Sequence, residues 1–126
     1  MGQGILADSN CAVDYLENKL SNNVVFLLES NRIELSVINR IELLSWRTAT
    51  IEQVNNLQGF LNNCLIHYLS EEIILKTIEI RKNFRLKLPD AIIAATALIH
   101  NLTLYSRNLS DFNKIPGLNV INPHSL

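Results

Sequence analysis

The sequence predicts an α/β fold, a three-layer α/β/α sandwich around a central, mostly parallel sheet. Short apolar segments with strand character alternate along the chain with longer segments that carry apolar residues at helical spacing. Strands separated by helices run parallel, are joined by right-handed crossovers and need helices on both faces of the sheet. Ligands bind at the carboxyl ends of the strands in such sheets, so the residues that follow each strand are candidates for a functional site.

Length and composition indicate one globular domain over residues 1–126, since 48% of the residues are hydrophobic. The net charge of −1 provides no general attraction to nucleic acid, so a polyanion would have to be held by a local basic patch or a bound metal. No apolar run reaches the ~18 residues of a membrane span, and the first residues lack a secretory signal pattern. We therefore expect a cytoplasmic protein with no membrane partner, in which Cys11 and Cys64 are reduced, buried thiols.

The first strand and the first two helices are predicted between residues 4 and 31. "GILAD", residues 4–8, is a short apolar strand that ends at Asp8. "SNCAVDYLENKL", residues 9–20, has helical spacing, with Ser9 or Asn10 available as the N-cap. "NVVFLLESN", residues 23–31, indicates a short second helix.

A second strand is predicted in "RIELSV", residues 32–37, because its apolar residues alternate. Ser36 can cap a helix that runs to about Trp46. Trp46 with Leu43 and Leu44 has the spacing of core residues, whereas an exposed tryptophan there would favour a groove for a partner.

Three further helices and three strands complete the alternation. Thr50 and Gln53 have the form of a capping box that opens a helix ending near Leu61. Ser70 opens a helix to about Phe84, and Pro89 suits the first position of the next one. The strands are "CLIHYL", residues 64–69, "LTLYS", residues 102–106, and, after a polar loop, "LNVI", residues 118–121.

Four acidic residues follow the strands or open the helices. Asp8 ends the first strand, Glu42 lies in the helix after the second, Asp90 is in the first turn of the most apolar helix, and Asp111 is in the polar loop. A cluster of carboxylates is unfavourable because each charge raises the pKa of its neighbours. A divalent cation relieves that repulsion, and Mg²⁺ prefers such oxygen ligands. The alternative is that each acid only caps a helix or complements its dipole.

Four segments resemble those of PIN-domain proteins of the small VapC-like toxin type, in the order that the family shows and over residues 5–121. They are "ILADSNCAVDYL" with Asp8 and Asn10, "SVINRIELL" with Ser36 and Glu42, "LPDAIIAATAL" with Asp90, and "LYSRNLSDF" with Ser106, Asn108 and Asp111. Ser106 stands where the family usually has threonine, and Cys11 and Ala12 replace bulkier aliphatic residues.

The resemblance implies a PIN-like fold and a Mg²⁺-dependent endoribonuclease, with Mn²⁺ as the alternative metal, that is the toxin of a toxin–antitoxin pair. It implies an RNA substrate, an antitoxin that covers the site, and a homodimer. The catalytic and metal-binding residues would be Asp8, Glu42 and Asp90, completed by Asp111. Side chains that orient these ligands or their waters would be Asn10, Ser36, Ser106 and Asn108. On this assignment, Asp8→Asn and Asp90→Asn should each abolish cleavage and raise the metal-free melting temperature.

Five of the eleven basic residues lie between Lys76 and Lys87, where Arg81 and Arg85 have the spacing of one helical turn. With a nuclease site, they would form a phosphate-contacting edge that runs toward Asp90. The candidate RNA-binding residues are Arg81, Lys82, Arg85, Lys87 and Arg107. The alternative is a solvated helix face balanced by Glu71, Glu72 and Glu79.

Two rival functions are compatible with a small α/β domain that carries several acids. A phospho-acceptor receiver domain would need an aspartate at the end of the middle strand, and residues 51–69 contain none. A non-catalytic RNA- or protein-binding module that keeps the fold stays open, although all four acids are present. We interpret Asp14 and the three histidines, which have no metal-ligand spacing, as structural or surface residues.

Overall fold

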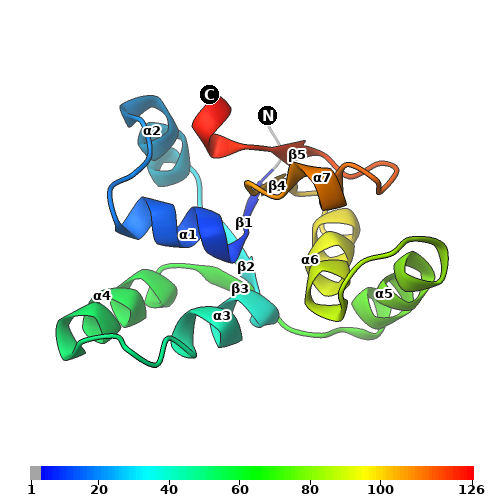
Figure 1. The fold of residues 1–126 in the computed structure, drawn as a ribbon, viewed down its shortest axis with the longest axis horizontal. Coiled ribbons are helices and arrows are strands. Elements are labelled where there is room, and N and C mark those ends of the chain that lie inside the picture. Colours follow the sequence, from blue (N-terminus) through cyan, green and yellow to red (C-terminus); the bar gives the residue numbers. More distant parts are fainter. Residues whose placement is uncertain (1–3) are drawn as a thin grey trace.

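The computed structural model describes residues 4–126, in which five strands alternate with seven α-helices (Figure 1). The strands are β1 (Ile5–Ala7), β2 (Ile33–Ser36), β3 (Leu65–His67), β4 (Thr103–Tyr105) and β5 (Val120–Ile121). The helices are α1 (Ser9–Leu16), α2 (Asn22–Ser30), α3 (Val37–Leu44), α4 (Ile51–Asn62), α5 (Glu71–Asn83), α6 (Leu88–Ile99) and α7 (Leu109–Phe112). A 3-10 turn, η1 (Pro123–Ser125), follows β5.

The five strands form one parallel sheet with the order β3-β2-β1-β4-β5. The central strand β1 pairs with β2 on one side and with β4 on the other, so the direction in which strands are added reverses at β1. At such a reversal the loops after the two strands lead to opposite faces and leave a crevice at their carboxyl ends. The residues after β1 and β4 therefore lie side by side, and the backbone N–H of Asp8 donates to the Tyr105 carbonyl at 2.9 Å.

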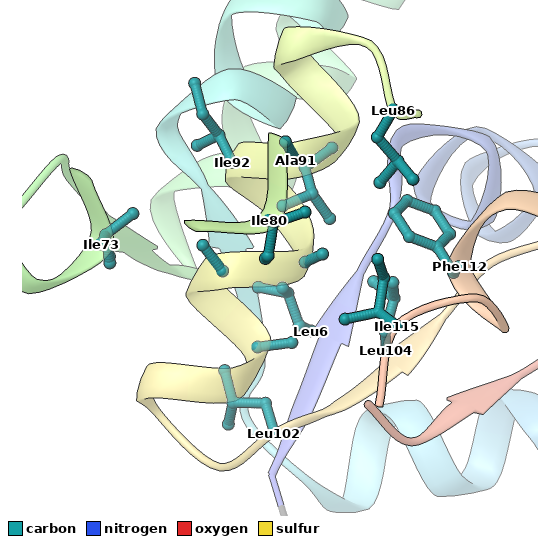
Figure 2. Packing of buried hydrophobic residues seen from close by; sticks show 14 residues of the cluster. Leu6, Ile73, Ile80, Leu86, Ala91, Ile92, Leu102, Leu104, Phe112 and Ile115 are labelled. Atoms are coloured by element: carbon teal, nitrogen blue, oxygen red, sulfur yellow. The ribbon is translucent and has the colours of Figure 1, made fainter. Parts of the chain in front are cut away.

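Helices cover both faces of the sheet, as the sequence predicts. On one face, Ile5 and Ala7 of β1 are buried together with residues of α1, α2 and α4. On the other face, Leu6 and Leu104 are buried with residues of α5 and α6, and Figure 2 shows Phe112 and Ile115 on this same side. Successive residues of β1 thus contact opposite layers, as the period of two in a strand requires.

Among the helices of residues 4–126, α6 has the longest run of buried residues. Seven consecutive residues, Ala91 to Ala97, are buried, because α6 packs both on the sheet and against α5. This explains why its sequence is apolar all round and small in the middle. Only its first turn, which contains Asp90, reaches the carboxyl edge of the sheet.

Five predictions about the elements need correction. Asp8, not Ser9 or Asn10, is the N-cap of α1, because its carboxylate accepts from the Ser9 N–H. That helix ends at Leu16, four residues earlier than predicted, and Asn18 follows it with a left-handed φ of 58°.

The other corrections concern later elements. Pro89 is the second residue of α6, which begins at Leu88. Strand β3 is limited to Leu65–His67, and the polar loop after β4 contains the short helix α7. These differences of one or two residues come from capping contacts that spacing alone does not specify.

Both cysteines are free, as predicted, with Cys11 buried and Cys64 half-buried. Burial raises the pKa of Cys11 to about 12, and the neighbouring Asp14 and Asp8 carboxylates add to this rise. Burial likewise raises the pKa of Cys64 to about 11. Neither thiol is ionised at neutral pH, so neither is a nucleophile. Among residues 4–126, none of the helices combines the length and the apolar character needed to cross a bilayer.

Candidate active site

Asp8 is the most heavily hydrogen-bonded of the four acids and is only 7% exposed. Its Oδ1 accepts from the Ser9 backbone N–H at 2.9 Å and from Asn39 Nδ2 at 3.3 Å. Its Oδ2 accepts from Ser106 Oγ at 2.7 Å and from Asn10 Nδ2 at 3.3 Å. Four donors from three separate segments therefore hold this carboxylate in one orientation.

Asn39 is a site residue that the sequence analysis missed. It is fully buried at the start of α3, where its Oδ1 accepts from the Ser36 N–H at 3.0 Å in a capping box. Its Nδ2 donates to Asp8 Oδ1 and, at 3.0 Å, to Ser9 Oγ. The available signal was its place three residues after the predicted cap Ser36, where an amide can complete a capping box.

Replacing Asn39 by alanine is expected to lower the free energy of unfolding by about 2–3 kcal/mol, because the Ser36 N–H and one Asp8 oxygen would lose buried partners. Asn31→Ala is the matched control, since its exposed Nδ2 donates only to the Leu27 carbonyl. That control should change stability by less than about 0.5 kcal/mol. Urea unfolding of both variants provides the comparison, and equal losses would contradict the bridging role of Asn39.

Ser36 has a capping role that is visible in the structure. Its Oγ accepts from the Ile38 N–H at 3.1 Å at the start of α3. It therefore reaches the Asp8 carboxylate through Asn39, while its predicted effect on ligands of the site stays a prediction.

Glu42 is exposed on α3, where its Oε1 accepts from Ser9 Oγ at 2.7 Å. Ser9 in turn receives a hydrogen bond from Asn39, so a chain of polar contacts joins the second acid to Asp8. Ser9 is a second residue that the sequence analysis overlooked as a site residue. Its hydroxyl orients the more exposed carboxylate, and its backbone N–H donates to the buried one.

Asp90 differs from Asp8 because, within residues 4–126, no donor is hydrogen-bonded to its carboxylate. Burial raises the pKa of Asp90 above its ordinary value, and the charges of Asp8, Asp111 and Glu42 raise it further. Lys87, at the N-cap position of α6, lowers it. The fold therefore brings all four predicted acids close enough for the other three to act electrostatically on Asp90.

The fourth acid, Asp111, lies in the short helix α7. Asn108 Nδ2 donates to its Oδ2 at 3.2 Å, and Lys114 forms an ion pair with Oδ1 at 3.5 Å. Ser106 Oγ accepts from the Asn108 N–H at 3.0 Å and also lies 3.4 Å from Asn10 Nδ2. The predicted orienting residues Asn10, Ser106 and Asn108 are therefore in contact with Asp8 or Asp111.

The donor set suits Mg²⁺, although the protein does not form a closed cage for it. Among residues 4–126, no three His, Cys, Asp or Glu side chains lie close enough together to hold a metal ion by themselves. Mg²⁺ does not need such a cage, because it keeps several waters and is usually bound by one or two carboxylates together with substrate phosphates. Three features fit this cation. The ligands are hard oxygen atoms, the neighbouring carboxylates repel Asp90, and no donor within residues 4–126 is hydrogen-bonded to the Asp90 carboxylate.

The predicted basic edge is only partly assembled. Arg81 and Lys82 are exposed in the last turn of α5, but that helix ends at Asn83. Arg85 therefore lies beyond the helix, and the predicted shared helical face with Arg81 is wrong. Lys87 is exposed next to the start of α6, and its charge acts on Asp90. Their contact with RNA stays a prediction.

A groove with a volume of about 540 Å³ opens beside Asp8. Its polar end includes Glu42 and Arg107, and its apolar part includes Trp46, which is 44% exposed. The remaining lining residues are Ser9, Asn10, Val13, Leu16, Glu17, Leu43, Gln53, Asn56 and Leu57. Leu43 is buried in the core, whereas Leu44 and Trp46 are exposed, so the structure favours the partner-groove interpretation of Trp46.

Comparisons with known proteins agree with this architecture. The family profile described as PIN domain matches residues 5–118. A toxin–antitoxin complex from Klebsiella pneumoniae has a chain that is 31% identical, with a TM-score of 0.77 over 95% of this chain and 98% of that one. VapBC2 from Rickettsia felis bound to a promoter DNA fragment is 26% identical, with a TM-score of 0.79 over 94% and 97% of the two chains.

DNA-bound VapBC from Salmonella typhimurium is 23% identical, with a TM-score of 0.77 over 95% of this chain and 98% of that one. A search of curated protein sequences gives no significant match. The structural matches confirm the fold class that the sequence predicts.

Proposed function

The chain belongs to the PIN domain family, and on that basis we propose that it is a Mg²⁺-dependent endoribonuclease, the toxin of a toxin–antitoxin pair. The observation that supports the proposal most directly is the environment of the Asp90 carboxylate. This carboxylate has no hydrogen-bond donor within residues 4–126, and three other acids raise its pKa. A carboxylate whose ionised form is disfavoured by burial and by neighbouring charges, at the carboxyl edge of a parallel sheet, is well placed to bind a cation.

The proposed chemistry is in-line attack of water on an RNA phosphodiester, without a covalent protein intermediate. Bound Mg²⁺, or Mn²⁺, would supply a more acidic water and neutralise charge that develops on a phosphoryl oxygen. Asp90, Asp8, Glu42 and Asp111 would hold it, directly or through the waters that Mg²⁺ keeps. Because protein donors keep both Asp8 oxygens oriented, Asp8 needs little reorganisation when substrate arrives.

The test is to incubate purified protein with total cellular RNA and to map the new 5′ and 3′ ends by sequencing. With Mg²⁺ we expect cleavage at a small set of sites, and with an excess of EDTA we expect none. Restoring Mg²⁺ should restore cleavage, which excludes damage by the chelator. Cutting that persists in EDTA would show that the nuclease is a contaminant or that the reaction needs no metal.

The alternative, a non-catalytic binding module, is favoured by one observation, namely that no three metal-ligating groups among residues 4–126 are already assembled. It predicts RNA binding without new RNA ends under both conditions. The same mapping experiment therefore separates the two functions.

We propose that the antitoxin places a segment in the groove beside Asp8. The support is that similar structures are toxin–antitoxin complexes and that the groove combines exposed Trp46 with polar Glu42 and Arg107. Trp46 is the single tryptophan of the chain, so its fluorescence reports on this groove alone. Complex formation should shift its emission to shorter wavelength. An unchanged spectrum in a complex isolated by size exclusion would place the antitoxin elsewhere.

We also propose that the protein is a cytoplasmic homodimer. The support is an exposed apolar surface on β3, α5 and the segment between them, made of Leu65, Tyr68, Leu69, Ile74, Leu75 and Ile78. Several exposed apolar side chains on neighbouring elements are typical of a protein–protein interface. Light scattering should give twice the chain mass of 14.3 kDa, and a monomer at micromolar concentration would contradict the proposal.

A further inference from the structure

Asp14 is a buried acid that the proposed chemistry does not use. It lies on α1, six residues after Asp8, and is 3% exposed. Its Oδ2 accepts from His124 Nε2 at 2.7 Å and lies 3.3 Å from Arg107 Nε. A carboxylate this buried is unfavourable without such partners. Three segments that are distant in the sequence therefore meet at one oxygen atom.

Arg107 connects this oxygen to the site. Its backbone N–H donates to Asn10 Oδ1 at 3.1 Å, and the Nδ2 of the same asparagine donates to Asp8. Its side chain is 53% exposed and lines the groove together with Ser9 and Glu42. The guanidinium thus belongs both to the buried ion pair and to the open edge of the carboxylate cluster.

The ion pair between Arg107 and Asp14 leaves part of the guanidinium available to bind a phosphate. Its Nε is the atom that faces Asp14, so its two terminal nitrogens are not used by this ion pair. A guanidinium recognises phosphate oxygens through two parallel N–H donors, which lysine cannot do. A phosphodiester close to Asp8 is therefore a suitable ligand for the outer edge of Arg107.

His124 shares the Asp14 Oδ2 atom with Arg107. It lies in η1, where its backbone N–H donates to Asn122 Oδ1 at 3.0 Å and the preceding Pro123 is buried, and its 38% exposed ring is held by the contact with Asp14. Without the imidazole, the buried Asp14 oxygen would have Arg107 as its remaining side-chain partner. The guanidinium would then be drawn inward, away from the groove.

We propose that Asp14 and His124 are positioning residues that hold Arg107 in place to bind an RNA phosphate beside the carboxylate cluster. This inference rests on the proposed nuclease function. It assigns a role in substrate binding to two residues that the sequence pattern indicates only as structural. RNA is favoured over the antitoxin as the ligand, because the Arg107 backbone is joined to Asp8 through Asn10.

The experiment measures kcat and KM separately on a short RNA oligonucleotide that contains a mapped cleavage site. Arg107→Ala should raise KM roughly tenfold, the effect of losing a charge-assisted contact. His124→Ala should raise KM roughly threefold with kcat within about twofold, since the arginine is misplaced but still present. His124→Gln, whose amide nitrogen can replace Nε2 as a donor, should restore KM. Lys19→Ala is the control, because it removes an exposed cation paired with Glu17.

The Arg107→Ala/His124→Ala double variant should have the KM of Arg107→Ala alone, because His124 acts only through the arginine. A purely structural role of His124 would lower the melting temperature of both His124→Ala and the double variant, with additive or no effects on KM. That outcome would overturn the inference. Asp14→Asn should also raise KM, and a fall in KM would show that Asp14 sequesters the arginine instead. If Asp14→Asn does not fold, the KM values of the His124 variants still test the positioning role.

A failure of the proposed function has a different signature. If the wild type does not cleave RNA, fluorescence anisotropy of the same oligonucleotide measures binding directly. Weaker binding by Arg107→Ala and His124→Ala, with rescue by His124→Gln, would then support the positioning role without catalysis. No RNA binding by the wild type, or an effect of these variants on antitoxin binding alone, would overturn it.

Discussion

Asp90→Asn is expected to reduce RNA cleavage by more than about 100-fold while raising the melting temperature of the metal-free protein. Cleavage should fall because the amide cannot provide the negative charge that binds the cation. Stability should rise because burial and the charges of Asp8, Asp111 and Glu42 all disfavour the ionised Asp90 carboxylate. Removing one charge from this cluster relieves repulsion, and we expect a gain of about 1–4 °C.

The gain in melting temperature of Asp90→Asn over the wild type should increase as the pH rises from acidic to neutral. Because the pKa of Asp90 is raised on folding, the folded state binds more protons than the unfolded state between the ordinary and the raised pKa. Stability is therefore lost as the pH rises through this interval. At acidic pH, where Asp90 is neutral, the variant and the wild type should melt at similar temperatures. At neutral pH the variant should melt higher.

Glu52→Gln is the matched control, because Glu52 is an exposed acid in the first turn of α4. It loses a favourable interaction with the helix dipole of about 0.3–1 kcal/mol, so its stability should fall slightly and its cleavage should not change. Differential scanning calorimetry with EDTA, and again with Mg²⁺, measures these effects. Mg²⁺ should stabilise the wild type more than Asp90→Asn, because only a specific site couples binding to folding in this way. A lower metal-free melting temperature for Asp90→Asn would refute the repulsion argument.

Asp8→Asn should also abolish cleavage, but it should lower the melting temperature. Both Asp8 oxygens accept hydrogen bonds, from Ser9 and Asn39 at Oδ1 and from Ser106 and Asn10 at Oδ2. An asparagine would place an NH₂ donor against two of these donors and would remove the charge that caps α1. We expect a loss of about 2–3 kcal/mol, which corresponds to roughly 10 °C for a chain of this length.

This prediction replaces the expectation, based on charge alone, that both substitutions stabilise the fold. Thr50→Ala provides a control, since it removes the N-cap of α4 and should cost about 1 kcal/mol without affecting cleavage. Comparing RNA cleavage and melting temperature between Asp8→Asn and Thr50→Ala separates a loss of catalytic activity from a loss of stability. An increase in the melting temperature of Asp8→Asn would mean that repulsion outweighs its four hydrogen bonds.

The fold was predictable from local patterns because one or two helices separate each strand from the next along the chain. Apolar runs ended at Asp8 and Ser36, and the capping box at Thr50 and Gln53 is present as predicted. Element ends were wrong, as at Pro89, because caps depend on individual hydrogen bonds rather than on periodicity. The four-residue helix α7 was not predicted either, since it lies within the predicted polar loop.

The site was predictable to a lesser degree. The four acids could be selected as candidates because the carboxyl ends of parallel strands meet at one edge, and in the structure burial and then the charges of the other three raise the pKa of Asp90. Asn39 and Ser9 escaped notice because their role lies in contacts across 31 and 33 residues of chain. Arg81 and Arg85 were wrongly placed on one helical face, because their spacing matches one helical turn although α5 ends at Asn83, before Arg85.

Sequence alone thus determined the parallel sheet and the covering helices, because periodicity is a local property, and it led to the prediction that Asp8, Glu42, Asp90 and Asp111 form the site. Tertiary structure alone decided which of these carboxylates is satisfied and which is not. Asp8 receives four donors from distant segments and Asp90 receives none within residues 4–126. The physical reason is that the pKa and the hydrogen bonding of an acid depend on groups that only folding brings near it.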